Sequence, residues 1–171
     1  MEEQSFRKMR RFGQQLDEAT CIEILNRNTN GTLAVLGDGG YPYAVPLSYA
    51  YHEGRIYFHS AIQGHKIDAL RRDARCSFCV VDKDQIVPEE FTTYFRSVIA
   101  FGQARIIDDK DEMLRALNLL ADKYSPEQTD DERRTEFSHC FPRVAVIVLT
   151  IEHLTGKQAR ELMPKTPANS Y

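Results

Sequence analysis

Short hydrophobic runs with the character of β-strands recur along the chain and are separated by turn-forming residues. Runs rich in β-branched and aromatic residues cover positions 31–37, 41–51, 55–59, 75–81, 92–107 and 142–152. The turn signal Asp38-Gly39-Gly40 joins the first two runs and predicts a hairpin. The last run is apolar from 144 to 151 except at Thr150, which predicts a central strand buried on both faces.

Prolines and a glycine predict where these strands are interrupted. Pro42 and Pro46 each remove a hydrogen-bond donor from the run 41–51, which indicates an edge strand or a local break. Gly102 lies inside the run 92–107 and predicts a bulge or a bend.

Three segments have the period of an α-helix. The segment 16–25 begins with Asp17 as its cap, and a second helix follows Gly64. The segment 108–124 is the longest, and Asp109 with Glu112 resembles a capping box. Its predicted apolar face comprises Met113, Leu114, Leu117, Leu120, Ala121 and Tyr124. The polar stretches 82–90 and 128–134 are expected to be connections.

The order of these elements predicts the fold class. Strands follow strands with few intervening helices, which favours an antiparallel sheet closed into a barrel. We therefore predict a mainly β protein, with about six antiparallel strands and helices at the rim. Residues 16–162 form a single domain in this interpretation, between a basic N-terminal arm, 1–15, and a polar tail, 163–171. The arm either is solvated or wraps onto a partner subunit, and the sequence leaves both open.

A cluster of polar residues lies where the run 55–59 gives way to a helix. The connecting loop is expected to carry His59, Ser60, Gly64, His65 and Lys66. Hydroxyl, imidazole and ammonium donors would meet the positive end of a helix there, which predicts a phosphate site. The alternative is that two basic residues decorate an exposed first turn. A basic residue opposes the helix dipole at that position, so the alternative is mildly unfavourable without an anion.

Charge and composition exclude several classes of partner. Lys and Arg number 22 against 25 Asp and Glu, a net charge of -3, which does not favour nucleic acid or an anionic membrane. No apolar run approaches the roughly 20 residues of a membrane span. The start, Met1-Glu-Glu-Gln-Ser, is acidic and lacks the plan of a signal peptide. We expect a soluble, cytoplasmic protein with no membrane or nucleic-acid partner.

The cysteines do not predict a metal site. Without an export signal, the four are expected to be free thiols. Cys76 and Cys79 have the spacing of a zinc or redox motif, but an odd offset in a strand sends the two sulfurs to opposite faces. Motifs for nucleotide-binding loops, zinc proteases and serine hydrolases are absent from the sequence. A triad could be drawn from Ser60, His59 and Asp68, although nothing in their pattern is specific to a hydrolase.

Four segments carry a resemblance to a known family. They are Gly31-Thr-Leu-Ala, Tyr41-Pro-Tyr-Ala-Val-Pro-Leu-Ser-Tyr, Ile56-Tyr-Phe-His-Ser-Ala with Gly64-His-Lys66, and Thr93-Tyr-Phe-Arg-Ser-Val-Ile-Ala-Phe-Gly102. In order and spacing they resemble the split-barrel flavoproteins related to pyridoxamine 5′-phosphate oxidase. The branch named for 5-nitroimidazole resistance proteins is the most similar, and the resemblance extends over residues 7–162.

This resemblance implies a six-stranded antiparallel split β-barrel that binds FMN as a homodimer, with the flavin in a cleft between subunits. It implies two groups of cofactor-binding residues in one subunit, the phosphate contacts His59, Ser60, His65 and Lys66 and the strand beneath the isoalloxazine ring, Pro46, Leu47, Ser48 and Tyr49. Arg96 and Ser97 match a flavin-contacting pair from the second subunit, and Lys157 is a further candidate near the same site.

The implied activity is a two-electron reduction. NAD(P)H would be the donor, and a small electrophile such as a nitroaromatic of the 5-nitroimidazole type the acceptor. His59 is the catalytic candidate because an imidazole can gain or lose a proton near neutral pH, although it could instead orient the phosphate. Two alternatives stay open: a module that binds FMN or haem without fast turnover, and a structural dimer with an empty cleft. The oxidase itself carries a Trp near its C-terminus, and this chain has none, which argues against pyridoxamine phosphate as the substrate.

Overall fold

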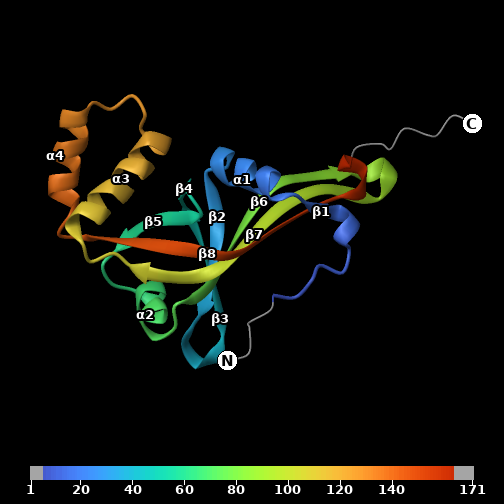
Figure 1. Cartoon of the computed structure of the whole chain (residues 1–171), viewed down its shortest axis with the longest axis horizontal. Coiled ribbons are helices and arrows are strands. Elements are labelled where there is room, and N and C mark those ends of the chain that lie inside the picture. Colours follow the sequence, from blue (N-terminus) through green and yellow to red (C-terminus); the bar gives the residue numbers. More distant parts are fainter. Residues whose placement is uncertain (1–5, 164–171) are drawn as a thin grey trace, which may run out of the picture.

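An antiparallel sheet of eight strands forms the body of the protein (Figure 1). The computed structural model describes residues 6–163. The strand order is β3 (Pro42–Ser48), β2 (Asn30–Leu36), β6 (Arg75–Val87), β7 (Thr92–Ile106), β8 (Val144–Gln158), β5 (Arg55–Ala61) and β4 (Ala50–His52), while β1 (Gln15–Leu16) pairs with β8. The predicted run 41–51 is divided at Tyr49 into β3 and β4, the other five predicted runs each correspond to one strand, and β1 is additional.

The two ends of this sheet are consecutive in the chain. β3 ends at Ser48 and β4 begins at Ala50, so Tyr49 alone joins the first strand of the sheet to the last. The sheet therefore curls round without a complete ladder of hydrogen bonds, which is the architecture of a split barrel. The prediction of a mainly β split barrel is confirmed. β3 is an edge strand, and the extended run is interrupted where β3 ends, as the two prolines predicted.

The centre of the sheet is buried on both faces. From Ala145 to Leu149, every residue of β8 is buried, as the apolar run predicted. One set of side chains enters the barrel interior, where Tyr49, Phe58 and Phe78 are the largest fully buried residues. The alternate set faces α3 (Lys110–Tyr124) and packs with its residues Met113, Ala116 and Leu117.

Four helices surround the sheet: α1 (Glu18–Arg27), α2 (His65–Arg72), α3 and α4 (Asp130–Cys140). The carboxylate of Asp17 accepts a hydrogen bond from the Thr20 N–H at 2.7 Å, which confirms this residue as the cap of α1. Asp109 caps α3 in the same way through the Glu112 N–H. The Glu112 carboxylate turns to Arg105 instead of returning to the cap, so the predicted box is only half formed. None of these helices is long and apolar enough to cross a membrane.

Four expectations from the sequence are corrected. β5 continues to Ala61, so His59 and Ser60 lie in the strand and not in the loop. β6 runs on to Val87 instead of becoming a loop at residue 82, because β7 pairs with it along the whole hairpin. The connection expected at 128–134 contains the start of α4, which the capping box of Thr129 and Glu132 begins. Leu114 is exposed on α3, where it borders a pocket shared with α4, and Ala116 takes the buried position.

The segment before the barrel is partly anchored. The ring of Phe6 stacks on His153 with centroids 4.6 Å apart, and Gln15 and Leu16 pair with Lys157 and Gly156. Residues 1–5 of the predicted arm and 164–171 of the predicted tail lie outside the described residues.

Candidate functional site

The N-terminus of α2 is open to a ligand. Gly64 precedes the helix with φ 128° and ψ 169°, a conformation that is essentially restricted to glycine. A Cβ on Gly64 would meet no atom within 4 Å, so space lies above its backbone. No side chain caps the helix, which leaves its first N–H groups without the usual acceptor. The end therefore presents backbone donors and the positive end of the helix dipole.

His65 is held by the β2–β3 turn. Its ring stacks on Tyr43 with centroids 4.1 Å apart. Its Nε2 accepts a hydrogen bond from the Asp38 N–H at 3.3 Å and lies 3.6 Å from the Asp38 carboxylate. That carboxylate also pairs with Arg72 at 2.7 Å. Because Nε2 is engaged with Asp38, His65 can offer a ligand its Nδ1 or its backbone N–H.

Lys66 is the cation left for a ligand at this end of α2. Its side chain is half-buried, and among residues 6–163 no carboxylate lies within ion-pair distance of it. A half-buried ammonium without a partner favours an anion more strongly than a fully solvated one does. Ser60, at the end of β5, donates its hydroxyl to the Ala61 carbonyl at 3.0 Å, so it is not aligned as a free donor.

The predicted strand beneath the flavin ring divides into exposed and buried parts. Pro46 and Ser48 are exposed on β3, while Leu47 between them is half-buried. Tyr49 is fully buried in the barrel and donates its hydroxyl to the Leu25 carbonyl at 2.7 Å. Burial raises the pKa of the Tyr49 phenol, so this side chain is a neutral core residue.

Tyr124, at the end of α3, fixes the bend where Tyr49 lies. The Tyr124 hydroxyl accepts a hydrogen bond from the Tyr49 N–H at 2.8 Å and also contacts the carbonyls of Tyr49 and Thr29. Beside it, the Lys123 ammonium lies 4.1 Å from the centroid of the Tyr49 ring. Burial lowers the pKa of Lys123 to about 8. The bend that ends β3 is thus tied to α3, a link that the sequence did not indicate.

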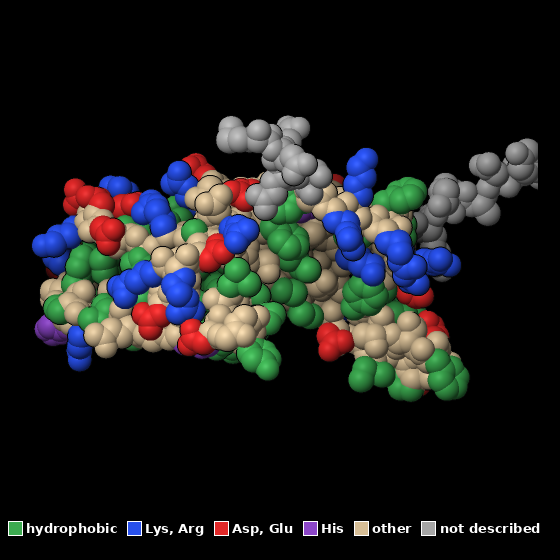
Figure 2. Space-filling view, turned by 90° about the horizontal axis from the view of Figure 1, so that it is seen from below, with side chains coloured by type: hydrophobic (Ala, Val, Ile, Leu, Met, Phe, Trp, Pro, Cys, Tyr) green, Lys and Arg blue, Asp and Glu red, His purple; other side chains and the backbone are tan. Residues whose placement is uncertain are grey.

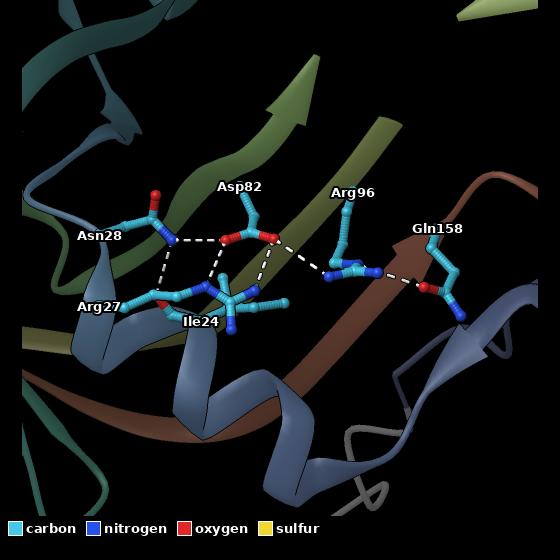
Figure 3. Close-up of polar contacts among 6 residues, drawn as sticks. All are labelled: Ile24, Arg27, Asn28, Asp82, Arg96 and Gln158. Carbon is cyan, nitrogen blue, oxygen red and sulfur yellow. Dashed lines mark hydrogen bonds and ion pairs between the residues drawn. The ribbon is translucent and has the colours of Figure 1, made fainter. Parts of the chain in front are cut away.

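Arg96 belongs to a network around Asp82 (Figure 3). The Asp82 carboxylate, 8% exposed, accepts two hydrogen bonds from Arg27 at 2.8 and 2.7 Å and one from Asn28 at 2.9 Å. The guanidinium of Arg96 lies 3.5 Å from the same carboxylate and donates to the Gln158 side chain at 3.2 Å. The network joins α1 to three strands and holds the Arg96 side chain in one direction.

A β-bulge places Asp82 in this network. Val81 pairs with Ser97 and Lys83 pairs with Arg96, so Asp82 is the extra residue on β6. Such an insertion re-aims one side chain out of the regular alternation. Burial raises the pKa of Asp82, but the hydrogen bonds from Arg27 and Asn28 outweigh this effect and the net pKa is lowered. Asp82 is therefore an ionised partner for two arginines.

Ser97 and Lys157 lie on the opposite face of the sheet from Arg96. Ser97 pairs directly with Lys157, whose Nζ lies 5.3 Å from the centroid of the Phe95 ring. Adjacent residues of a strand point to opposite faces, so a ligand flat on one face meets either Arg96 or Ser97. Ala104, which bonds to the segment just after α2, is seven residues from Ser97 along β7, or about 23 Å. Figure 1 likewise shows α2 far from the tip of the β6–β7 hairpin.

His59 lines a cavity of about 520 Å³ beneath α3 and α4. Ser48 reaches the same cavity from the end of β3, so the structure brings these two predicted site residues together. The predicted residues thus fall into three groups. They are the α2 terminus with Lys66 and His65, the cavity with His59 and Ser48, and the hairpin with Arg96, Ser97 and Lys157.

The described part of the chain offers neither a reactive thiolate at Cys76 or Cys21 nor a cluster of metal ligands. Burial raises the pKa of Cys76 to about 12 and that of Cys21 to about 11, so neither is a reactive thiolate at neutral pH. Within the described part of the chain, no cluster of three or more His, Cys, Asp or Glu side chains could hold a metal ion.

Comparisons with known proteins agree with this architecture. The family described as pyridoxamine 5′-phosphate oxidase matches residues 17–158. A proposed 5-nitroimidazole antibiotic resistance protein from Bacteroides thetaiotaomicron has a similar structure, with TM-score 0.69 and 23% identity over 84% of this chain and 86% of that one. An FAD-binding protein from Mesorhizobium loti gives TM-score 0.62 and 27% identity over 85% and 96% of the two chains. A flavocytochrome from Azotobacter vinelandii gives TM-score 0.71 and 21% identity over 89% and 72%. No curated protein sequence matches the chain.

Proposed function

Because the chain belongs to the pyridoxamine 5′-phosphate oxidase family, we propose that it binds a flavin, FMN, and works as an NAD(P)H-dependent reductase of small electrophiles such as nitroaromatics. The similar structures include proteins named for FAD binding and for nitroimidazole resistance, which supports a flavin as the cofactor class. The observation that carries the proposal for this chain is the open N-terminus of α2.

The residues at this terminus fit the phosphate of FMN. The phosphate is close to a dianion, and the uncapped first turn of α2 offers it backbone N–H groups. Gly64 leaves room for close approach, and Lys66 supplies a half-buried positive charge. Asp38 pairs with Arg72 and contacts His65 Nε2, so these two side chains are already engaged. Lys66 is therefore the residue on which phosphate affinity depends most.

The remaining roles in one subunit belong to β3, β5 and the cavity. When bound, the flavin supplies the two-electron chemistry. Pro46 and Ser48 present an exposed surface of β3 on which a flat ring can lie. His59 lines the cavity, where its imidazole can donate a proton to, or orient, a bound acceptor.

The proposal includes a homodimer with the flavin at the subunit interface. Ser97 pairs with Lys157 on the half of β7 nearer the β6–β7 hairpin, and Figure 1 shows α2 far from the tip of that hairpin, which supports contact with the flavin of a second copy. The hairpin also exposes apolar side chains, with Ile86 74% and Phe91 98% accessible. In Figure 2 the right-hand end of the molecule projects from the body and carries apolar side chains. An exposed apolar projection of this kind favours burial against a partner subunit.

A titration of the purified protein with FMN tests the phosphate site. Lys66→Ala should weaken FMN binding by about tenfold or more, because one charge-assisted hydrogen bond is worth ~1.5–3 kcal/mol. Lys110→Ala, an exposed lysine at the start of α3, is the matched control and should leave the affinity unchanged. Equal FMN affinities of the Lys66→Ala and wild-type proteins would contradict the assignment of the FMN phosphate to this site.

The similarity to a flavocytochrome favours one second candidate, a module that binds FMN or haem without fast turnover. Anaerobic addition of NADH or NADPH separates the two functions. The flavin absorption bands of a reductase bleach soon after NADH or NADPH is added, whereas those of a binding module persist. A Soret band after addition of haem would identify the haem-binding form of the second candidate.

A further inference from the structure

The cavity beside His59 has the size and the walls of a small-molecule site. Its volume of about 520 Å³ lies within the range of ligand pockets in proteins. α3 forms one wall with Leu117 and Leu120, and α4 contributes Phe137. Val144, at the start of β8, completes the apolar lining. These walls suit a planar or compact hydrocarbon body.

Among the described residues, the cavity lining includes one carboxylate, Glu136, and one imidazole, His59. None of the described lining residues is Lys or Arg. Burial and then the Glu136 carboxylate raise the pKa of the Cys140 thiol, while Arg143 acts in the opposite direction. Two cations of α3 and α4 make their contacts with residues outside the lining: Lys123 lies over the Tyr49 ring, and Arg133 pairs with Asp122. An anionic ligand would meet the Glu136 carboxylate here, and among the described lining residues only the His59 imidazole could offer it a positively charged partner.

The cavity is a neighbour of the proposed phosphate site but is formed by different residues. His59 and Ser48 line the cavity, whereas the phosphate-binding groups lie beyond the end of β5, at the start of α2. Figure 1 shows α2 and the α3–α4 pair at the same end of the sheet, on either side of β5. A ligand in the cavity would thus lie next to a flavin whose phosphate is held by α2.

We propose that this cavity binds a small aromatic molecule that is neutral or positively charged, and that the Glu136 carboxylate excludes molecules that carry a carboxylate or phosphate. One part of this inference rests on the proposed function, namely that the molecule in the cavity is the electron acceptor of the flavin. Binding in the cavity does not require the flavin. The cavity would accordingly exclude phosphorylated aromatic molecules and bind uncharged or cationic aromatic rings.

Three probes of nearly equal shape test the charge preference. Benzamidine, benzamide and benzoate carry charges of about +1, 0 and −1 at neutral pH. Isothermal titration calorimetry or ligand-observed NMR should give dissociation constants for benzamidine and benzamide at least about fivefold below that for benzoate. Glu136→Gln should shrink the ratio between benzoate and benzamidine by about fivefold and change benzamide by less than about twofold. Equal binding of all three probes by the wild-type protein would overturn the inference.

A second variant tests the place of binding. Ala121 lines the cavity from α3, so Ala121→Trp should fill it and abolish binding of all three probes. Leu114→Trp is the matched control, because Leu114 is exposed on the same helix and borders a separate pocket between α3 and α4 instead of this cavity. The control should bind the probes as the wild type does. Unchanged probe binding in a folded Ala121→Trp protein would place the ligand elsewhere and refute the inference.

An FMN titration of the same variants keeps this inference separate from the proposed function. Ala121→Trp should lose the aromatic probes and retain FMN affinity. Loss of FMN together with the probes would show that the cavity holds the flavin itself, which contradicts the inference and leaves the proposed function standing. A wild-type protein that binds benzamide but no FMN would refute the proposed function while supporting the cavity.

Discussion

The replacement Asp82→Asn should destabilise the protein by about 2–3 kcal/mol. The Asp82 carboxylate is almost fully buried and accepts hydrogen bonds from Arg27 and Asn28, with Arg96 at 3.5 Å. Hydrogen bonds to charged groups contribute ~1.5–3 kcal/mol each, and removal of one partner of a buried ion pair costs ~3–5 kcal/mol. Arg27 is about half exposed and can regain water, which reduces the total toward the lower value.

Urea denaturation of the wild-type and variant proteins measures this difference. A loss of 2–3 kcal/mol corresponds to a melting temperature lower by roughly 5–10 °C for a chain of this length. Asp84→Asn is the matched control, since Asp84 lies on the same strand with an exposed side chain. It should change the free energy of unfolding by less than about 0.5 kcal/mol.

The pH dependence of the same difference gives an independent check. The pKa of Asp82 is lowered in the folded state, so its stabilisation is present above the ordinary aspartate pKa of about 3.9. It is lost as the pH falls through the lowered value. The wild type and Asp82→Asn should therefore differ most at pH 5–8 and converge in acid. Equal stability of the two proteins at pH 7, or a difference that persists in acid, would refute the role given to this carboxylate.

Three further outcomes are expected. Gly102→Ala should cost about 3 kcal/mol or more, or prevent folding, because the new Cβ would lie 1.9 Å from the Thr150 carbonyl oxygen; a near-normal melting temperature would contradict the register of β7 on β8. Tyr124→Phe should cost ~1–3 kcal/mol in urea, because it leaves the Tyr49 N–H without an acceptor, and unchanged stability would contradict the link between α3 and the β3 bend. Cys76, with its pKa raised to about 12, should resist a thiol reagent at pH 8 until the protein unfolds; peptide mass mapping would expose rapid native labelling as a contradiction.

The sequence predicted those parts of the fold in which local pattern and tertiary environment agree. The run 144–151 is apolar because β8 is buried on both faces, and Asp17 caps α1 as its position before a periodic segment suggested. α4 escaped prediction because none of its residues is buried, so no apolar stripe marks it. The second half of β6 was missed for a similar reason. It is stabilised by pairing with β7 in a projecting hairpin and not by burial of one face.

The candidate site was predictable as a set of residues but not as an arrangement. The glycine and the basic pair at the start of α2 could be read from the chain, since Gly64 immediately precedes the predicted helix. The direction of His59 could not, because it depends on β5 continuing to Ala61. Asp82 gave no signal at all. Its role depends on a bulge that brings it to Arg27 and Arg96, which are distant in sequence.

The absorption spectrum of the purified protein from about 300 to 700 nm, with FMN added if the protein is colourless, tests the central claim most directly. The account predicts flavin bands that remain with the protein through gel filtration, weaken in Lys66→Ala and bleach when NADH or NADPH is added without air. A protein that stays colourless after FMN is added and removed would contradict the assignment of the α2 terminus as a flavin phosphate site.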